Sequence, residues 1–302
     1  MDSFPISVII PSYNGANRIH NLLKGLENQT FDCFETIIII DGSTDNTVEV
    51  LKAEKFKLKK LILIEQENLD KVKTRNNGSK KASGELLIFF DDDMIPEPTC
   101  IENHFQFHKN NYNCILSGNG YRNKQYTNTD FGHYLLAIEK YWQSLHPTEY
   151  QITLDKPRMT ACNLSLPKKL FDELEGFDEQ LKDCEDIDMA IRALKKNTSI
   201  FYNSNIKAWH NDSPTLKTYI NRLNQYNKAV VKLFDIKPEY KNYLHYEFTQ
   251  KQVPLFKKMI LILFKNNFFL KIDSFFEKKL IPKKIKYFSY QLIIAANSDI
   301  NK

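Results

Sequence analysis

The chain has 302 residues, of which 42% are hydrophobic and 26% are charged, enough to bury the core of one large domain with an appendage. Its net charge of +5 is uneven, because residues 251–302 carry +8 and the first 250 residues carry −3. The first 250 residues are thus mildly acidic, and the basic segment holds Lys but no Arg. Such a surface binds nucleic-acid phosphates poorly, which excludes a nucleic-acid partner.

The first hundred residues alternate between short apolar runs and amphipathic segments. The apolar runs predict strands at residues 6–10, 36–40, 61–64 and 85–90. The segments between them predict helices at residues 19–26, from 48 onward, and at 72–82. This alternation is typical of βαβ units, so we expect an α/β fold with a mostly parallel sheet flanked by helices.

Polar residues follow three of these strands. Tyr13 and Asn14 follow the first strand, residues 41–43 (Asp-Gly-Ser) follow the second, and Asp91, Asp92 and Asp93 follow the fourth. Ligands of open α/β sheets bind outside the carboxyl ends of the strands. The sequence therefore predicts that these three segments form one site.

The aspartate triplet is a candidate metal site. Three adjacent carboxylates repel one another unless a cation or solvent neutralises them, and oxygen ligands suit Mg²⁺ or Mn²⁺. The alternative interpretation is an acidic turn, because a D-x-D pattern alone is a weak signal. The shared location of the three polar segments favours the metal site.

The chain after the aspartate triplet carries further elements in order. Phe131 to Trp142 form an amphipathic aromatic stripe that predicts a helix. Glu185 and Asp186 open a second helix, whose apolar face repeats through Leu194. A strand is expected at residues 199–202, followed by His210 and a further amphipathic helix.

The basic segment at residues 251–302 combines 11 Lys with nine Phe and Tyr. Lys clusters interleaved with bulky apolar groups suit an anionic membrane surface. A packed helical subdomain with a solvated Lys face explains the same composition, so both interpretations stay open. The longest purely apolar run, at residues 259–264, is too short to span a bilayer.

The five cysteines lack C-x-x-C spacing, and an odd number cannot all pair within the chain. This pattern predicts a reducing compartment. The first ten residues have no basic region and no unbroken apolar region, so we expect no signal peptide. The expected location is cytoplasmic, with the basic segment offering contact to the inner face of the cell membrane.

In order and spacing, the motifs resemble those of the family 2 glycosyltransferases, which have the nucleotide-binding GT-A fold. The resemblance covers residues 5–235 and is strong as an ordered set. The motifs that resemble those of the family are residues 7–14 (SVIIPSYN), 41–47 (DGSTDNT), 74–78 (TRNNG), 82–85 (ASGE), 91–93 (DDD), 176–179 (GFDE) and 185–188 (EDID). The sequence departs from the family at Ile40, where the family often has a second acidic residue. Asp41 must therefore contact the nucleotide base alone.

The resemblance implies the donor side of the site. Pro11, Tyr13 and Asp41 would bind the nucleotide, with Tyr13 against the base and Asp41 accepting from the N–H of a uracil-like base. Arg75 would lie close to the nucleotide, where it could pair with Asp41 or meet the diphosphate. Asp91 and Asp92 would lie near the ribose, a water molecule and the donor sugar.

The resemblance also implies the metal ligands and the base. Asp93 would bind Mn²⁺ or Mg²⁺, which offsets the charge that grows on the departing diphosphate. His210 is a candidate second ligand, although a lone His is more often structural. Asp186 would be the base that deprotonates the acceptor, with Glu185 beside it, and the helix dipole would favour its ionised form. Acids in a first helical turn are also routine dipole compensation.

These implications predict a metal-dependent, inverting hexosyltransferase. It would move a sugar from a nucleotide-sugar, with UDP the expected carrier, to a saccharide or lipid-linked saccharide acceptor in surface polysaccharide synthesis. The expected domains are a GT-A domain at residues 1–235 and a basic helical extension at 236–302. The alternatives are a non-catalytic saccharide-binding protein of the same fold and a sugar-1-phosphate nucleotidyltransferase. The nucleotidyltransferase should carry a Gly- and Arg-rich phosphate loop, which residues 11–15 do not offer.

Overall fold

The computed structural model describes residues 5–244, 261–265, 269, 272–277 and 281–298. The chain divides into two compact units. Met1–Tyr121 and His146–Asn211 form the first unit, and Arg122–Leu145 and Asp212–Lys302 form the second.

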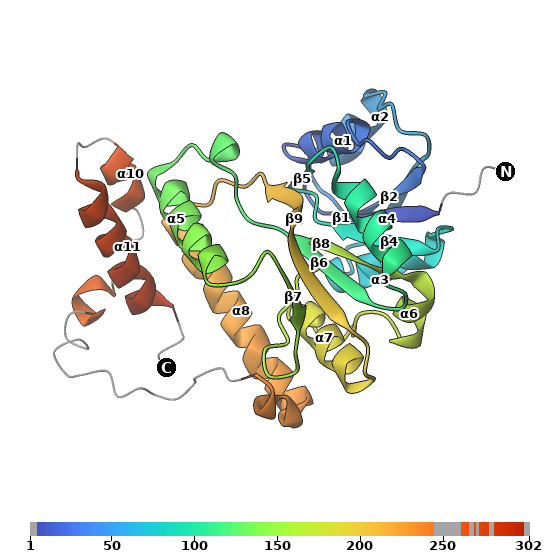
Figure 1. The fold of residues 1–302 in the computed structure, drawn as a ribbon. Coiled ribbons are helices and arrows are strands. Elements are labelled where there is room, and N and C mark those ends of the chain that lie inside the picture. Colours follow the sequence, from blue (N-terminus) through green and yellow to red (C-terminus); the bar gives the residue numbers. More distant parts are fainter. Residues whose placement is uncertain (1–4, 245–260, 266–268, 270–271, 278–280, 299–302) are drawn as a thin grey trace. The chain divides into compact units, whose positions relative to one another are not determined.

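The first unit is built on a nine-stranded sheet with the order β3-β2-β1-β4-β8-β6-β9-β5, in which β7 also pairs with β9 (Figure 1). The strands are β1 (Ile6–Ser12), β2 (Phe34–Asp41), β3 (Leu61–Gln66), β4 (Leu86–Phe90), β5 (Met94–Pro96), β6 (Ile115–Asn119), β7 (Glu149–Ile152), β8 (Asn163–Pro167) and β9 (Ile200–His210).

The N-terminal half of the sheet is parallel, as the alternating pattern predicts. β1 lies between β2 and β4, with Ile6 opposite both Phe34 and Leu86, and β2 pairs with β3. Every residue of β1, β2 and β4 is buried, which explains why these strands read as unbroken apolar runs. Their carboxyl ends therefore lie together at one edge of the sheet.

The other half of the sheet is mixed. β8 runs antiparallel to both β4 and β6, and β9 runs parallel to β6 but antiparallel to β5 and β7. The predicted strand at residues 199–202 is only the beginning of β9, which continues to His210. β5, β6 and β7 are three to five residues long, too short to show a period in the sequence. The predicted α/β fold is confirmed, and every antiparallel pairing in the sheet involves β8 or β9.

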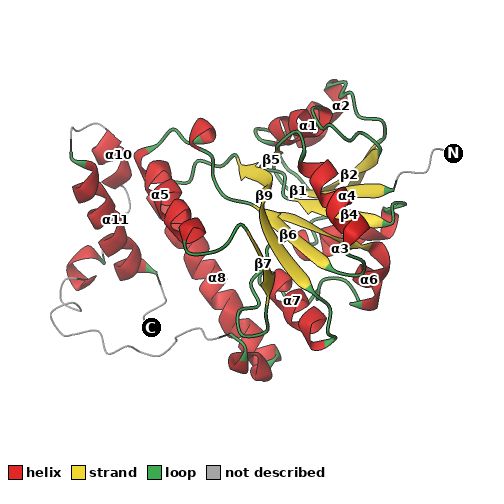
Figure 2. Ribbon diagram, viewed as in Figure 1, coloured by secondary structure: helices red, strands yellow, loops and turns green. Residues whose placement is uncertain are grey.

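Helices cover both faces of the sheet (Figure 2). One face packs against α1, α2 and α4, and the other packs against α3, α6 and α7. Ile6, Val8 and Ile10 of β1 face the first group of helices, while Ile9 faces the second, as strand alternation requires. The helices are α1 (Ile19–Glu27), α2 (Thr47–Ala53), α3 (Lys71–Lys81), α4 (Cys100–Asn110), α6 (Lys168–Glu173) and α7 (Glu185–Lys195).

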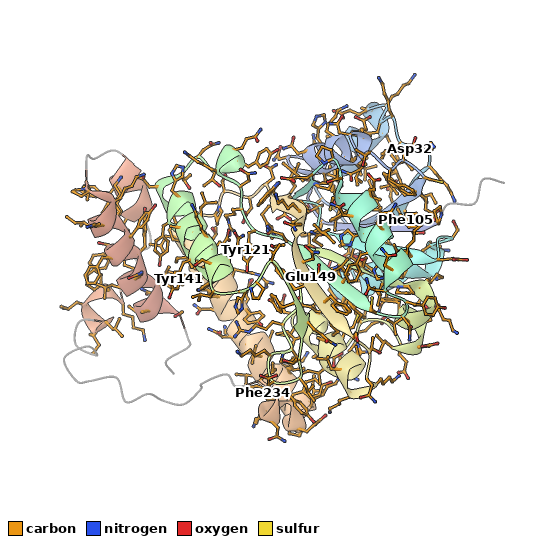
Figure 3. The ribbon with its side chains drawn as sticks, viewed as in Figure 1. Asp32, Phe105, Tyr121, Tyr141, Glu149 and Phe234 are labelled. Atoms are coloured by element: carbon orange, nitrogen blue, oxygen red, sulfur yellow. The ribbon has the colours of Figure 1, made fainter. Side chains whose placement is uncertain are left out.

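The described residues of the second unit form helices and the loops between them. Its core joins Phe131 and Tyr134 to Ile220, Tyr290 and Ile293. The predicted aromatic helix is confirmed as α5, the first α-helix of this unit. Figure 3 labels Tyr141, an exposed residue near the carboxyl end of α5. The elements are α5 (Asp130–Ser144), α8 (Leu216–Ile236), α10 (Ile272–Glu277), α11 (Lys283–Asn297) and the 3-10 helices η1 (Lys124–Tyr126) and η2 (Pro238–Asn242).

The predicted boundary at residue 235 separates elements that pack together in the second unit. α5 and α8 precede the boundary, yet they share a hydrophobic core with α10 and α11, which follow it. Lys286 of α11 is buried and pairs with Asp130 of α5. Within the described ranges, no helix is long and apolar enough to cross a bilayer. Residues 251–260, which begin the predicted membrane-binding segment, lie outside the described residues.

Candidate functional site

A cavity of about 200 Å³ lies at the carboxyl ends of β1, β2 and β4. The sequence analysis placed three polar segments there, and the structure brings all three together around this cavity. The first turn of α3 completes the wall. The lining residues are Pro11, Ser12, Tyr13, Arg18, Asp41, Lys71, Thr74, Asp91, Asp92 and Asp93.

Asp41, the last residue of β2, is buried and held by the loop that follows β3. Its Oδ1 accepts hydrogen bonds from Gln66 Nε2 at 2.7 Å and from the Leu69 amide at 2.8 Å. Its Oδ2 accepts one from the Asp70 amide at 3.1 Å. The next residue, Gly42, has a φ of 65°, and a Cβ there would lie 2.6 Å from the Asn68 amide nitrogen. The carboxylate is therefore fixed at the cavity wall.

The loop after β1 carries Tyr13, which is 47% exposed at the cavity. Asn14 adopts a φ of 50°, and its side-chain oxygen accepts hydrogen bonds from the amides of Thr44 at 2.8 Å and Asp45 at 3.3 Å. This residue ties the loop after β1 to the loop after β2. The tie leaves the Tyr13 ring free to face a ligand in the cavity.

Asp92 is buried beside the same loop. Its Oδ2 accepts a hydrogen bond from Ser12 Oγ at 2.8 Å, and Arg18 Nε lies 2.6 Å from its Oδ1. A Cβ on Gly15 would lie 2.6 Å from Oδ2, so only glycine allows this close approach. Burial raises the pKa of Asp92, and the pairing with Arg18 opposes that shift.

Arg75 of α3 is fully buried. It joins the aspartate triplet, through Asp91, to the two acids at the start of α7, through Glu185. Its guanidinium pairs with Asp91 and, at 2.6 Å, with Glu185. Lys71 Nζ, one turn earlier on α3, lies 3.6 Å from the same Glu185 oxygen. We call Arg75, Lys71, Asp91 and Glu185 the Arg75 network. The pairing with Asp41 that the sequence analysis offered for Arg75 is not formed, since Asp41 is bonded by Gln66 and the loop amides.

The network controls the charge of Asp91. Burial alone would raise the pKa of this carboxyl, but Arg75 and Lys71 outweigh burial and lower it. The two carboxylates likewise outweigh burial at Arg75 and keep its pKa above the ordinary value. Asp91 therefore stays ionised.

Asp186 follows Glu185 in the first turn of α7, as predicted. Cys184, the residue before the helix, has a φ of 65°, which turns the chain sharply into the two acids. Burial and the neighbouring Glu185 raise the pKa of Asp186 to about 7, whereas Lys71 and Arg75 act in the opposite direction. The sequence analysis expected the helix dipole to favour the ionised form of Asp186. Burial and the negative charge of Glu185 outweigh that effect and favour the protonated form.

Asp93 and His210 lie beside each other across β5 and β9. Met94 pairs with His210, and the Asn211 amide donates to the Asp93 carbonyl at 2.8 Å. The His210 ring bonds through Nδ1 to the Gly120 carbonyl, which leaves Nε2 as the nitrogen for a ligand. Among the described residues, no three His, Cys, Asp or Glu side chains converge on one point. The backbone pairing places Asp93 and His210 at neighbouring positions, and a carboxylate and an imidazole are both side chains that bind metals in proteins.

Sequence reasoning missed Arg18 and Lys71. Arg18 lies in an irregular loop, where spacing gives no direction to a side chain. Lys71 carried a signal, because it is the first residue of α3, where the helix dipole disfavours a cation. Lys71 Nζ also lies 3.1 Å from Asp183. Burial alone would lower the pKa of Lys71, but Glu185, Asp91 and Asp183 raise it, so the cation persists in the cavity wall.

The sheet, its helical layers and the cavity at the strand ends define the GT-A class of glycosyltransferase fold. The model of the family described as "Glycosyl transferase family 2" matches residues 7–174. The chain belongs to this family.

Named relatives agree with this assignment. The chain is 34% identical over 113 residues to the uncharacterized glycosyltransferase YfnE of Bacillus subtilis, covering 37% of this chain and 29% of that protein. It is 28% identical over 197 residues to an uncharacterized glycosyltransferase of Rickettsia bellii, covering 64% of this chain and 26% of that protein. The chain thus matches less than a third of the length of these relatives.

A solved structure has a similar fold. Residues 1–349 of S. aureus TarS, crystallised with UDP, align at a TM-score of 0.55 with 18% identity, covering 98% of this chain and 90% of that one. The same TarS segment has also been crystallised with UDP-GlcNAc. At this identity the likeness shows the fold alone.

Proposed function

We propose that this chain transfers a sugar from a nucleoside diphosphate to an acceptor hydroxyl with inversion at the anomeric carbon. One observation carries the proposal. The buried guanidinium of Arg75 joins Asp91 of the donor cavity to Glu185, the neighbour of Asp186. The side chain that contacts the donor cavity therefore also contacts the residue next to the proposed base.

UDP is the nucleotide that we propose. Asp41 and Tyr13 line the cavity together, and Asp41 presents a carboxylate that accepts hydrogen bonds, as the N–H of uracil requires. The crystallisation of TarS, a protein of similar fold, with UDP supports this choice. Pro11 lies at the end of β1 beneath the same cavity.

Asp93 and His210 are the residues that would hold Mn²⁺ or Mg²⁺ in this site. A bound divalent cation supplies a positive charge that offsets the charge of the departing diphosphate. Arg18 and Lys71 add two fixed cations to the cavity wall, and Arg75 keeps Asp91 ionised beside them. The cavity therefore offers positive charge from its own side chains as well.

Asp186 is the base in the proposed reaction. It takes the proton from the acceptor hydroxyl while that oxygen bonds to the anomeric carbon, and the bond from that carbon to the diphosphate breaks. A pKa of about 7 suits this role, because a base with a pKa near the working pH combines basicity with a sufficient ionised fraction. The displacement needs no covalent enzyme intermediate.

We further propose a saccharide or lipid-linked saccharide acceptor, in surface polysaccharide synthesis on the cytoplasmic side of the membrane. Support comes from α11, which exposes Lys283, Lys284, Ile285 and Phe288. Such a basic and apolar surface suits anionic headgroups. Replacement of the exposed Lys283 and Lys284 by Glu, which leaves the core of the second unit intact, should release the chain from anionic vesicles. Equal sedimentation of both forms with the vesicles would contradict the membrane contact.

Calorimetric titration of UDP, GDP and dTDP, with and without Mn²⁺, tests the donor site directly. We expect UDP to bind most tightly, with an Mn²⁺-dependent gain that Asp93→Ala removes. Asp172→Ala, which changes an exposed carboxylate on α6, is the matched control and should bind as the wild type does. Binding of none of the three nucleotides would overturn the proposed function.

The variant Asp186→Asn separates binding from chemistry. It should retain UDP affinity, since Asp186 is not among the lining residues of the donor cavity. Release of UDP from a panel of UDP-sugars should fall by about 10²–10⁴-fold, the range for loss of a general base. Release at the wild-type rate would show that another group takes the proton.

A further inference from the structure

A second cavity in the first unit, of about 310 Å³, shares no residue with the donor cavity. One wall is a single face of α4 and the residue after it, formed by Asn103, Gln106, Phe107, Asn110 and Asn111. Their spacing of three and four residues places them together on the helix surface. This face has four amides, one aromatic ring and no charge.

The opposite wall comes from β7 and β9. Asn203 and Asn205 of β9 face the cavity with Glu149 of β7, which Figure 3 labels. Residues 204–206 form an irregularity in β9, because Gly118 pairs with Asn203 but Asn119 pairs with Lys207. Bulges of this kind redirect side chains and recur next to functional sites. Here the bulge directs Asn205 toward α4.

Part of this wall is held in place. Asn203 Nδ2 donates to Glu149 Oε2 at 2.6 Å, and Asn203 Oδ1 accepts from the backbone N–H of Asn205 at 2.9 Å. On the helix wall, Asn111 Nδ2 donates to the Phe107 carbonyl at 3.0 Å. Phe107 packs edge-on against Phe201, with ring centroids 5.4 Å apart. The ring and the bound amides are fixed before any ligand arrives.

The composition of this surface is unusual for the chain. Asn accounts for 28 of 302 residues, yet five of the nine lining residues are Asn. Charged residues make up 26% of the chain, but Glu149 is the single charged residue in the lining. Asn is a poor residue for a helix interior, where Asn103 lies, although Asn111 caps the carboxyl end of α4 by bonding the Phe107 carbonyl. The pattern points to recognition of a ligand.

We propose that this cavity binds a neutral saccharide, as a second site separate from the donor cavity. Sugar hydroxyls both donate and accept hydrogen bonds, and amides offer both functions on one group. Glu149 adds an acceptor for adjacent hydroxyls, and Phe107 adds an apolar surface for the C–H face of a sugar ring. The absence of Lys and Arg from the lining argues against phosphate or another anion as the ligand. The inference does not depend on the proposed transfer reaction.

Side-chain amide signals of the full ¹⁵N-labelled chain test the proposal. The probes are maltotriose, chitotriose and mannotriose, each added at millimolar concentration with and without saturating UDP. We expect at least one probe to shift the NH₂ signals of Gln106, Asn110 or Asn205 saturably, and the shifts to persist with UDP. The double variant Gln106→Ala/Asn205→Ala, which changes two exposed residues, should weaken that binding about tenfold.

Asn21→Ala is the control, because Asn21 is an exposed amide on a different helix, α1. It should leave the saccharide affinity unchanged. Three results would each overturn the proposal: no shift of these amides with any of the three probes, shifts that disappear when UDP saturates the donor cavity, or equal weakening by Asn21→Ala. Loss of UDP binding with retention of these shifts would instead count against the donor assignment alone.

Discussion

Two polar networks in the first unit differ in charge. The Arg75 network at the donor cavity is built from ions, with Arg75 between Asp91 and Glu185. Beneath α4, His104 bonds Ser165 at 2.7 Å and Asn163 at 2.8 Å, and His108 bonds the same Ser165 at 2.8 Å. We call His104, His108, Asn163 and Ser165 the histidine network. None of its members is a carboxylate or an arginine.

This difference sets opposite behaviour for the ionisable groups. In the histidine network, burial lowers the pKa of His104 to about 4 and that of His108 to about 3, so both rings are neutral at pH 7. In the Arg75 network, fixed cations outweigh burial and keep Asp91 ionised. The protein therefore keeps buried charge where the proposed chemistry needs it and uses neutral hydrogen bonds where only packing is required.

Arg75→Met tests the ionic network and should have the largest effect on stability. The change leaves the buried Glu185 and the partly exposed Asp91 without their main partner, and removing one partner of a buried ion pair costs about 3–5 kcal/mol. Thermal unfolding of the variant should shift down by roughly 10 °C. Arg75→Lys keeps the charge but cannot bond both acids with one planar group, so we expect an intermediate loss. A variant as stable as the wild type would show that the network contributes nothing to the fold.

Acid titration tests the neutral network. Each histidine has a folded pKa below the unfolded value of about 6.5, so the unfolded chain takes up protons first as the pH falls. Stability should therefore decline from pH 6.5 down to about 4 for His104 and about 3 for His108. The full loss from His104 amounts to roughly 3 kcal/mol.

His108→Gln supplies the comparison for this titration. The variant removes one titrating ring and should flatten the fall in melting temperature between pH 6 and 4. His20→Gln is the matched control, since His20 is a partly exposed histidine on α1. If His108→Gln and the wild type lost stability in parallel over this range, the neutral state of His108 would not be a source of the pH dependence.

The donor side of the site was predictable from the sequence because its residues follow apolar strands. Asp41 and Asp91 to Asp93 each come directly after a buried run, and parallel strands bring such ends together. The cavity contains every predicted donor residue except Arg75, which lies buried behind it. The roles of these residues stay predictions, since geometry places a side chain without showing what it binds.

The pairing partners could not be predicted in the same way. Arg75 and Glu185 are 110 residues apart in the sequence, and no local pattern brings α3 to α7. The pKa of Asp186 depends on burial and on Glu185, whereas the sequence suggested only the dipole of its helix. α4, with its amide face, was not predicted, because polar residues interrupt its apolar period. Tertiary contacts decided each of these features.

The variant Lys71→Met has the smallest expected effect. It tests whether a cation in the donor cavity wall influences the proposed base, Asp186. Lys71 opposes burial and Glu185 at Asp186, so its removal should raise the pKa of Asp186 above about 7. We expect an upward shift of this pKa, and each pKa unit corresponds to ~1.4 kcal/mol. ¹³C-labelled aspartate carboxyl signals measure the titration without any substrate, and Asp186→Asn identifies the signal. Lys71→Arg retains the charge and should titrate as the wild type does.

The direction of that shift decides what Lys71 does in the site. A base with a raised pKa is less ionised near neutral pH, so transfer should slow at pH 6–7 and recover at higher pH in Lys71→Met. A residue that only fills space would change stability or affinity at every pH alike. An unchanged Asp186 titration in Lys71→Met would therefore leave Lys71 as a structural partner of Asp183 and Glu185, which it contacts at 3.1 Å and 3.6 Å.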